Sequence, residues 1–270
     1  MTNVITYFSA FSGIGGFELA LENSHTQTSC AGYSEVDAHA LAVYQRQFPA
    51  HTNFGDIAAI DGASLPEFDL LVAGFPCQSF SMAGRRCGLQ DKRGSLVIEL
   101  LRIIEQKRPR LLLLENVKGL LSHGGGATFG RIIATLDDLG YHCQWQVLNS
   151  ALFGLPQHRE RVFIVGHLGN GRRLQVLPFL PSASRLPQQP LSKPRPSRIR
   201  PIWRYRDSVC ERRAALGGRA VRFLTPLECE RLQGFPDNWT VTLKDEHRYR
   251  CLGNAVSVPV VAAIVDRLLR

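Results

Sequence analysis

The sequence predicts an α/β fold in which a mostly parallel sheet is covered by helices on both faces. Short, wholly apolar segments alternate with helical segments as far as Gly166. Apolar strands such as Leu111–Leu114 are typical of a sheet that is buried on both faces, because neither side of such a strand meets water. A chain of 270 residues is long enough for one such domain with a small appended region.

The expected elements follow the apolar pattern and its stop signals. Pro109 and Gly140 each close a helical segment, since proline cannot continue a helix and glycine readily adopts the closing conformation. The expected strands are Val4–Phe8, Ser29–Ser34, Asp69–Ala73, Leu111–Leu114, Gln144–Leu148 and Arg161–Val165. The expected helices are Gly16–Glu22, Asp37–Phe48, Leu96–Lys107, Phe129–Leu139 and Val256–Leu269.

One more helix is indicated by its two ends. Thr225 suits the N-cap, Pro226 suits the first helical position, and Glu228 completes a capping box. Gly234 then supplies the stop. A short helix is therefore expected between Thr225 and Gly234.

Basic residues are concentrated between residues 167 and 222. This segment holds 13 Lys and Arg but only Asp207 and Glu211 as acids, a net charge of +11, so the rest of the chain carries −2 of the overall +9. Residues 167–201 also contain seven prolines and show no clear period. Such a segment suits a phosphate backbone. The alternative is a solubilising surface or an unstructured basic linker.

The spacing of the cysteines and the length of the apolar runs argue against a zinc-binding, disulfide-rich or membrane-spanning protein. The seven cysteines form no C-x-x-C pair, which argues against a zinc site and, with their odd number, against a disulfide framework. We therefore expect reduced thiols and no bound metal. The N-terminus lacks the pattern of a signal peptide, and no apolar run is long enough to span a bilayer. These features predict a soluble, cytoplasmic protein.

A glycine-rich turn follows the first expected strand. In Phe11-Ser12-Gly13-Ile14-Gly15-Gly16-Phe17 the glycines permit a tight turn and the close approach of a ligand to the backbone. Glu35 ends the second strand, where a carboxylate can accept hydrogen bonds from ribose hydroxyls, and Asp56 could bind an adenine amino group. This set favours a nucleoside cofactor over an ordinary turn. The glycine spacing departs from G-x-G-x-x-G, which argues against NAD.

Reactive or charged residues lie beside three other strands. Cys77 follows the strand Asp69–Ala73, where open α/β sheets bind ligands, although a buried structural cysteine is the alternative. Glu115 follows four leucines, so partial burial should raise the pKa of its carboxyl, unless it is a helix-capping acid. In Gln157-His158-Arg159-Glu160-Arg161, alternate residues share one face. Guanidinium groups on that face could bind a base carbonyl or a phosphate, or they could belong to a basic edge strand.

Taken in order, these segments resemble the DNA cytosine-5 methyltransferases over nearly the whole chain. Pro-Cys-Gln alone would be a weak motif, but the ordered set is very specific. The segments similar to the family's successive motifs are Phe11–Phe17, Glu35, Asp56, Pro76-Cys77-Gln78, Glu115-Asn116-Val117, Gln157-x-Arg159-x-Arg161, Arg222–Pro236 and Gly253-Asn254.

The resemblance implies a Rossmann-like, S-adenosylmethionine-dependent DNA (cytosine-5) methyltransferase. The methyl group would pass to carbon 5 of a flipped-out cytosine through a covalent Cys77 adduct, leaving S-adenosylhomocysteine. The implied catalytic residues are Cys77, Glu115, Arg159 and Arg161. The implied cofactor-binding residues are Phe11, Gly13, Ile14, Gly15, Glu35, Val36, Asp56, Ile57, Pro76, Leu96, Asn254 and Ala255. The implied DNA-binding residues are Gln78, Ser79, Ser81, Arg85, Arg86, Gln157 and Arg222.

The same resemblance divides the chain into two parts. Residues 1–166, completed by a C-terminal helix at 245–270, form the catalytic, cofactor-binding domain, and residues 167–244 form a small, basic target-recognition region. Only 55 residues, 167–221, separate the eighth motif from the ninth, which is short for the family. The Thr-rich recognition sequence that usually precedes the ninth motif is also missing from this sequence.

Two alternative functions remain open at this point. One is an RNA cytosine-5 methyltransferase, and the other is a DNA-binding or accessory subunit that needs a partner chain for recognition. The expected partners are double-stranded DNA and a restriction endonuclease or recognition subunit. We expect a monomer with no membrane association.

Overall fold

The computed structural model describes residues 4–76, 96–169, 175–177, 179 and 223–270. Within them lies a six-stranded sheet with the strand order β2-β1-β3-β4-β6-β5. Its strands are β1 (Ile5–Ala10), β2 (Thr28–Ser34), β3 (Leu70–Gly74), β4 (Leu111–Val117), β5 (Tyr141–Asn149) and β6 (Glu160–Leu168).

The strand directions agree with the predicted class. β1 pairs in parallel with β2 and with β3, and β3 pairs in parallel with β4. β6 is antiparallel to both β4 and β5, so it is the one reversed strand of the described sheet. The predicted α/β fold with a mostly parallel sheet is confirmed. The reversal brings the start of β6, at Arg161, beside the end of β4, at Val117.

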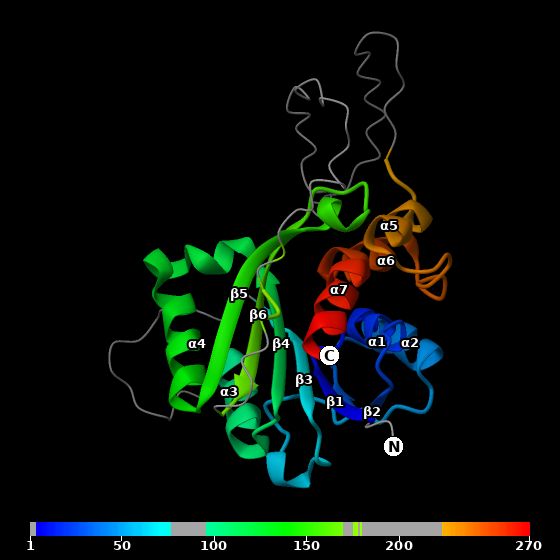
Figure 1. Cartoon of the computed structure of the whole chain (residues 1–270). Coiled ribbons are helices and arrows are strands. Elements are labelled where there is room, and N and C mark those ends of the chain that lie inside the picture. The colour runs from blue at the N-terminus through cyan, green and yellow to red at the C-terminus, as the bar shows by residue number, and fades with distance from the viewer. Residues whose placement is uncertain (1–3, 77–95, 170–174, 178, 180–222) are drawn as a thin grey trace, which may run out of the picture.

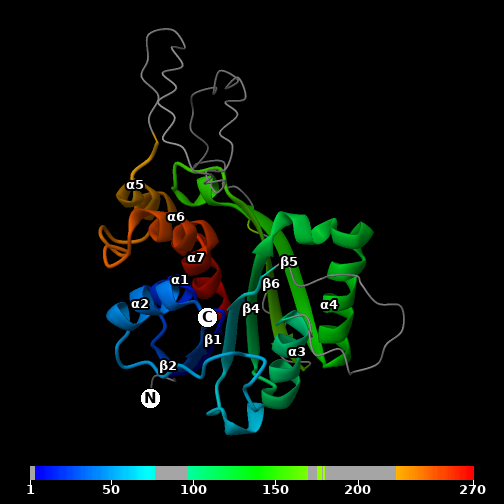
Figure 2. The same cartoon turned by 180° about the vertical axis from the view of Figure 1, so that it is seen from behind.

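Helices cover both faces of the sheet, as Figures 1 and 2 show from opposite sides. One face carries α1 (Gly16–Glu22), α2 (Ala38–Gln47) and α7 (Val258–Leu268), and the other carries α3 (Leu96–Lys107) and α4 (Ala127–Asp138). Leu111 and Leu113 of β4 enter the first core, whereas Leu112 and Leu114 enter the second. Because successive side chains of a strand point to opposite faces, a strand between two cores is apolar at every position.

The short helix α5 (Pro226–Gln233) has the predicted ends. The Thr225 hydroxyl accepts a hydrogen bond from the Glu228 N–H, and the Glu228 carboxylate accepts one from the Thr225 N–H. Gly234 ends the helix with a φ of 81°, a left-handed conformation in which glycine is not strained. The cap that the sequence indicated therefore fixes where the chain re-enters the folded core.

The single helix predicted at 245–270 is two helices, and the apolar helix predicted at Val256–Leu269 corresponds to the second of them. α6 (Asp245–Asn254) is followed by its C-cap residue Ala255, whose ψ of 156° is extended. The next helix, α7, begins at Val258. Pro259 lies in the first turn of α7, and proline has no N–H to donate to the carbonyl four residues earlier, which is that of Ala255. The break exposes the backbone carbonyls at the end of α6, and these carbonyls take part in the site described below.

The segment Asp245–Leu268 is, by length and apolar composition alone, long enough to cross a membrane, and 61% of its apolar window is buried within the protein. Its apolar residues Val260, Val261, Ile264 and Val265 belong to the same core as β1 and α1. Packing against the sheet therefore accounts for the apolarity of this segment.

Residues 223–244 return the chain from the basic segment to this core. Phe235 and Trp239 are buried in the cluster that contains α1 and α7. Residues 180–222 lie outside the described residues. The division into a catalytic domain and a recognition region at 167–244 therefore stays a prediction.

A buried acid lies on α1, directly after the glycine-rich turn. Glu18 is fully buried, and the Tyr44 hydroxyl donates a hydrogen bond of 3.0 Å to its Oε1. The same hydroxyl lies 3.1 Å from Nδ1 of His51. Burial raises the pKa of Glu18 to about 7, because an ionised carboxylate loses its hydration there. The folded protein consequently holds this proton more tightly than the unfolded chain does.

This carboxyl should make stability depend on pH. Between the ordinary pKa of 4.5 and about 7 the folded state binds more protons. The stabilisation is therefore complete below the lower value and is lost as pH rises through the upper one. The Glu18→Gln variant cannot ionise, so its unfolding free energy relative to wild type should rise by roughly 2–3 kcal/mol between about pH 5 and about pH 8. Urea denaturation at both pH values measures this, and a difference independent of pH would contradict it.

Candidate active site

The carboxyl ends of the neighbouring strands β1, β3 and β4 meet at one edge of the sheet. In Figure 1 this edge faces α5 and α6. The glycine-rich turn follows β1, Phe75 and Pro76 follow β3, and Glu115 lies near the end of β4. The fold thus brings three segments that are far apart in the sequence to one place.

The glycine-rich turn forms one wall of a small pocket. Gly13 has a φ of 58° and Gly15 a φ of 85°, conformations that side chains rarely adopt. A Cβ added to Gly13 would meet no atom within 4 Å, so this glycine faces open space. The pocket is lined by Phe11, Ser12, Gly13, Ile14, Gly16, Phe17, Gly74, Asn254, Ala255 and Val256. Five predicted cofactor-binding residues, Phe11, Gly13, Ile14, Asn254 and Ala255, are therefore brought together.

Glu35 ties the end of β2 to this turn. Its Oε2 accepts a hydrogen bond of 2.8 Å from the Gly13 N–H, and its Oε1 accepts bonds of 2.7 and 2.8 Å from the N–H groups of Val36 and Asp37. A carboxylate oxygen has two lone pairs, so Oε2 can accept from one more donor. The neighbouring Val36 side chain is 64% exposed. A hydrogen-bond acceptor and an apolar surface thus lie side by side next to the pocket.

Asp56 and Ile57 lie beside the end of β2. The Ser34 hydroxyl donates a hydrogen bond of 2.7 Å to the carbonyl of Gly55, which fixes this loop. The Asp56 side chain is exposed, and its Oδ1 accepts from the Ala58 N–H at 3.0 Å. Ile57, by contrast, is 2% exposed and packs in the core beneath α3. The Ile57 carbonyl accepts a hydrogen bond of 3.0 Å from Arg102, so the backbone N–H is the group of Ile57 suited to a ligand contact.

Glu115 and Arg161 form an ion pair within the site. Nε of Arg161 lies 3.0 Å from Oε1 of Glu115. In the β4–β6 register Glu115 is opposite Phe163, so Arg161 projects from the same face of the sheet as Glu115. Burial raises the pKa of the Glu115 carboxyl, and the positive charges of Arg161 and Arg159 partly oppose that rise. The predicted rise in this pKa is confirmed in direction.

Arg159 connects β6 to the break between α6 and α7. Its Nη2 donates hydrogen bonds of 3.0 Å to the carbonyl of Gly253 and 2.6 Å to that of Ala255. Burial lowers the pKa of this guanidinium to about 10. Two residues earlier, before β6 begins, Oε1 of Gln157 is buried without a hydrogen-bond partner among the described residues. Arg159 thus links the segment before β6, which lies near Glu115, to the chain around Asn254 at the end of α6.

Asn116 fixes the backbone that leads into the predicted nucleophile. Its Nδ2 donates a buried hydrogen bond of 2.8 Å to the carbonyl of Phe75. Gly74 pairs with Glu115 across β3 and β4, and a Cβ on Gly74 would lie 3.7 Å from Oε2 of Glu115. Pro76 is described and half-buried. The predicted residues that lie outside the described ones are Cys77, Gln78, Ser79, Ser81, Arg85, Arg86 and Arg222.

Leu96, the remaining predicted cofactor residue, begins α3 and is half-buried. It packs against the core beneath that helix. It does not line the pocket beside the glycine-rich turn. Its predicted contact with a cofactor therefore rests on the resemblance alone.

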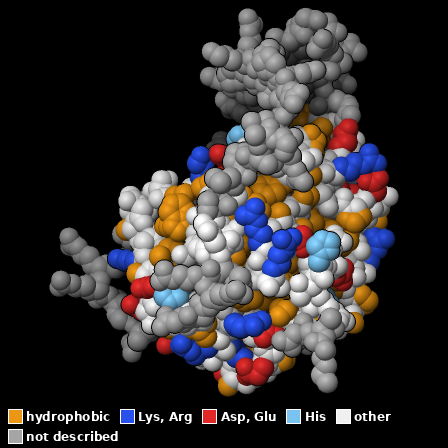
Figure 3. Space-filling view, in the orientation of Figure 1, with side chains coloured by type: hydrophobic (Ala, Val, Ile, Leu, Met, Phe, Trp, Pro, Cys, Tyr) orange, Lys and Arg blue, Asp and Glu red, His pale blue; other side chains and the backbone are white. Residues whose placement is uncertain are grey.

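Charge on the described surface is mixed. In Figure 3 the Lys and Arg side chains lie among Asp and Glu side chains over the face that is shown. This distribution fits the small net charge of the chain outside residues 167–222. The concentrated positive charge therefore belongs, by sequence, to residues 167–222.

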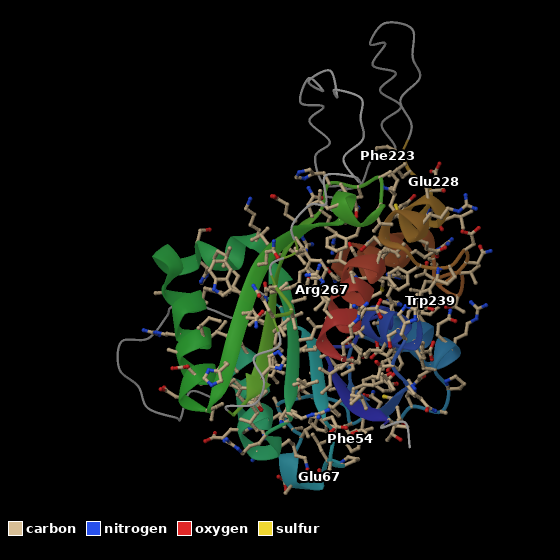
Figure 4. The ribbon with its side chains drawn as sticks, viewed as in Figure 1. Phe54, Glu67, Phe223, Glu228, Trp239 and Arg267 are labelled. Carbon is tan, nitrogen blue, oxygen red and sulfur yellow. The ribbon has the colours of Figure 1, made fainter. Side chains whose placement is uncertain are left out.

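A buried tryptophan supports the glycine-rich turn and was not predicted to do so. Nε1 of Trp239 donates a hydrogen bond of 2.8 Å to the carbonyl of Ile14. Figure 4 shows Trp239 between the α5–α6 connection and the N-terminal helices. A single tryptophan downstream of Gly234 carries no spacing signal, so sequence reasoning had no basis for pairing it with Ile14.

A second contact set that was not predicted holds the chain leaving β6. The Gln144 side chain accepts from the Leu177 N–H at 2.9 Å, and Gln146 accepts from the Phe179 N–H at 2.8 Å. The guanidinium of Arg267, labelled in Figure 4, lies 3.7 Å from the centre of the Phe179 ring. Glutamines at alternate positions of a strand share one face, which was the available signal. These contacts attach the start of the basic segment to β5 and α7.

Comparisons with known proteins agree with this geometry. The profile of the C-5 cytosine-specific DNA methylase family matches residues 5–220 and 210–270. Type II methyltransferase M.NlaX of Neisseria lactamica is 35% identical over 296 residues, covering 96% of this chain and 94% of that protein. Type II methyltransferase M.NgoBI of Neisseria gonorrhoeae is 37% identical over 94% of this chain and 89% of its own length. Among solved structures, the S. pombe Dnmt2 methyltransferase shares the fold, with a TM-score of 0.72 at 19% identity over 98% of each chain.

The Arg159 contacts lead to a stability prediction. In the Arg159→Met variant the side chain keeps its reach but loses both hydrogen bonds to the carbonyls of Gly253 and Ala255. The unfolding free energy should fall by roughly 1–3 kcal/mol, since the buried Ala255 and the exposed Gly253 lose a charged donor to their carbonyls. Urea denaturation measures the loss. Arg131→Met, at an exposed position of α4, is the control, and equal losses in the two variants would contradict the assigned role of Arg159.

Proposed function

Because the chain belongs to the C-5 cytosine-specific DNA methylase family and is accordingly a DNA (cytosine-5) methyltransferase, we propose that Cys77 is its nucleophile and that Glu115 and Arg161 hold the target base. The observation that carries this proposal is the pairing of Gly74 with Glu115 at adjacent strand ends. Cys77 follows Gly74 by only three residues, and this short separation supports assigning Cys77 to the same site as Glu115.

The proposed reaction proceeds through a covalent bond to Cys77. The Cys77 thiolate bonds to carbon 6 of cytosine, which moves electron density to carbon 5. When bound, S-adenosylmethionine would supply the methyl group that carbon 5 takes, and S-adenosylhomocysteine would remain. A base removes the carbon-5 proton, the ring double bond re-forms, and the bond between carbon 6 and sulfur breaks. The thiolate is thereby restored.

Glu115 is suited to stabilise the attacked base. Its raised pKa favours a carboxyl that keeps its proton and can donate a hydrogen bond to cytosine N3. The other carboxyl oxygen can accept from the exocyclic amine. Arg161, which already contacts Glu115, would donate to the carbonyl at carbon 2. Arg159 holds its place by binding the backbone of Gly253 and Ala255 and thereby supports Arg161.

The pocket beside the glycine-rich turn fits S-adenosylmethionine. Gly13 faces open space there, so a ligand can approach its backbone. Glu35 retains an acceptor for a ribose hydroxyl, and the exposed Val36 side chain offers an apolar surface to the adenine ring. Asp56 is exposed beside the same strand end and suits the adenine amino group. The pocket ends at Gly74, and this position would put the methyl group beside the base.

The DNA contacts are assigned to the basic segment and to the loop after Cys77. A base inside a duplex cannot reach the described site, so the cytosine must leave the stack. Gln157, whose buried Oε1 has no hydrogen-bond partner among the described residues, lies in the segment that leads through Arg159 into β6. We assign residues 167–244 to target recognition, anchored where Gln144 and Gln146 hold Leu177 and Phe179.

The cellular role is proposed from the relatives. M.NlaX and M.NgoBI are named type II methyltransferases, so we assign this chain to a restriction–modification context with a matching endonuclease. A monomer in the cytoplasm, associated with DNA, is the form expected for that role.

The decisive experiment uses purified chain and tritiated S-adenosylmethionine, with duplex DNA and tRNA offered separately. Label should appear in DNA, at carbon 5 of cytosine at defined sites. Label in tRNA alone would support the RNA alternative instead. Transfer that occurs only after a second chain is added would support the partner-dependent alternative.

Replacement of Cys77 by serine should abolish transfer. The hydroxyl of serine is a much weaker nucleophile than a thiolate. Binding of S-adenosylmethionine, measured by titration calorimetry, should stay near the wild-type value, because Cys77 is not assigned to the cofactor pocket. Cys87→Ser is the matched control and should keep most of the activity. Transfer by Cys77→Ser at a rate comparable to this control would refute the assigned nucleophile.

Replacement of Glu115 by glutamine should slow the chemical step. The amide can donate to N3 but cannot transfer a proton to it, and general acid assistance contributes about 10²–10⁴-fold in rate. Single-turnover methylation measures the chemical step directly. A rate within a few-fold of wild type would show that Glu115 only supports the fold.

A further inference from the structure

Trp239 contacts the cofactor turn from outside the pocket. Its indole N–H donates a buried hydrogen bond of 2.8 Å to the carbonyl of Ile14. Ile14 lies between Gly13 and Gly15 and lines the pocket. Trp239 itself is 7% exposed and does not line that pocket. Its influence on a ligand must therefore pass through the backbone of the turn.

The position of Trp239 is set by α2. Nε2 of Gln47 donates a hydrogen bond of 3.0 Å to the Trp239 carbonyl. The ring of Phe48 meets the indole edge to face, with centroids 5.9 Å apart. The same Phe48 ring lies against the turn, since a Cβ on Gly15 would come within 2.4 Å of its Cε2. Phe48 and Trp239 thus form the surface on which the turn rests.

The segment that carries Trp239 is itself held rigidly. Glu230 of α5 is fully buried, and its carboxylate accepts hydrogen bonds from the N–H groups of Asn238 and Thr240 at 2.8 and 2.9 Å. Arg248 of α6 pairs with the same carboxylate at 3.0 Å. The turn between α5 and α6 is consequently fixed on both sides of the indole.

We propose that Trp239 is a positioning residue for S-adenosylmethionine, in that its indole N–H holds the Ile14 carbonyl and so keeps the Gly13–Gly15 backbone in its binding conformation. The inference rests on the proposed cofactor site. A glycine-rich turn loses much conformational entropy when it is ordered. Holding one carbonyl in place before the ligand arrives removes part of that cost from binding.

The proposal also links this turn to the region predicted to recognise the target, because Trp239 lies within residues 167–244. Trp239 and Glu230 belong to the segment that follows residues 180–222 in the chain. A shift of α5 would therefore move the indole relative to Ile14. Cofactor affinity is expected to respond to changes at this connection as well as to changes in the pocket.

Trp239→Phe in the full chain tests the proposal, because phenylalanine keeps an aromatic ring but has no N–H. Titration calorimetry with S-adenosylmethionine should give a Kd about two- to tenfold above wild type, the range expected for one lost hydrogen bond. The rate of methylation at saturating cofactor should stay near wild type, so the effect appears in the KM for the cofactor. Trp145→Phe, at a half-exposed position of β5, is the matched control and should leave the Kd unchanged.

The outcomes separate this inference from the proposed function. An unchanged Kd with a lowered Tm in Trp239→Phe would overturn the proposal, since Trp239 would then only stabilise the fold. Failure of the wild-type chain to bind S-adenosylmethionine would instead overturn the proposed cofactor. If Trp239→Phe does not fold, Gln47→Met loosens Trp239 without touching the turn. A raised Kd in that variant supports the proposal, and an unchanged Kd overturns it.

Discussion

The placement of an acid beside a positive charge at the end of β4 is the interaction on which the rest of the site depends. Glu115 is buried, and Arg161 lies 3.0 Å from its carboxyl. Burial alone would leave an ionised carboxylate unpaired at high cost. The reversed strand β6 supplies Arg161 from the same face of the sheet. The antiparallel pairing of β4 with β6 therefore provides the positive charge that stabilises the ionised form of the buried Glu115 carboxyl and partly offsets the rise in its pKa.

The second constraint is the order of the parallel strands. β1, β3 and β4 are neighbours, so the glycine-rich turn, the segment that leads to Cys77, and Glu115 emerge side by side. Asn116 strengthens this arrangement through its hydrogen bond to Phe75. Arg159 connects the segment before β6 to this region by donating hydrogen bonds to the carbonyls of Gly253 and Ala255 at the end of α6. The sites proposed for the methyl donor and the base therefore lie beside each other at one end of the sheet.

Much of this could be predicted from the sequence, for identifiable physical reasons. The apolar run before Glu115 predicts a doubly buried strand, and the Thr225 capping box predicts the start of α5. The direction of the Glu115 pKa shift follows from that run as well. In each case the signal is local, lying within a few residues of the feature that it predicts.

Other features could not be predicted because they depend on contacts between distant segments. Nothing near Trp239 indicates Ile14 as its partner, and nothing near Gln146 indicates Phe179. The break between α6 and α7 was missed where residues 245–270 were expected to form one C-terminal helix. Glu35 was expected to bind a ribose, whereas the structure shows its carboxylate also holding the backbone of Gly13. Tertiary context determined all four.

The most direct measurement of the central claim is a covalent trap at Cys77. Duplex DNA carrying 5-fluorocytosine has no carbon-5 proton to lose, so an adduct formed by the thiolate and methylated at carbon 5 should persist. Mass spectrometry of the digested complex should then place the modified nucleotide on the Cys77 peptide, in a manner that requires S-adenosylmethionine. An adduct on another cysteine, or none while the same chain methylates ordinary DNA, would contradict the account.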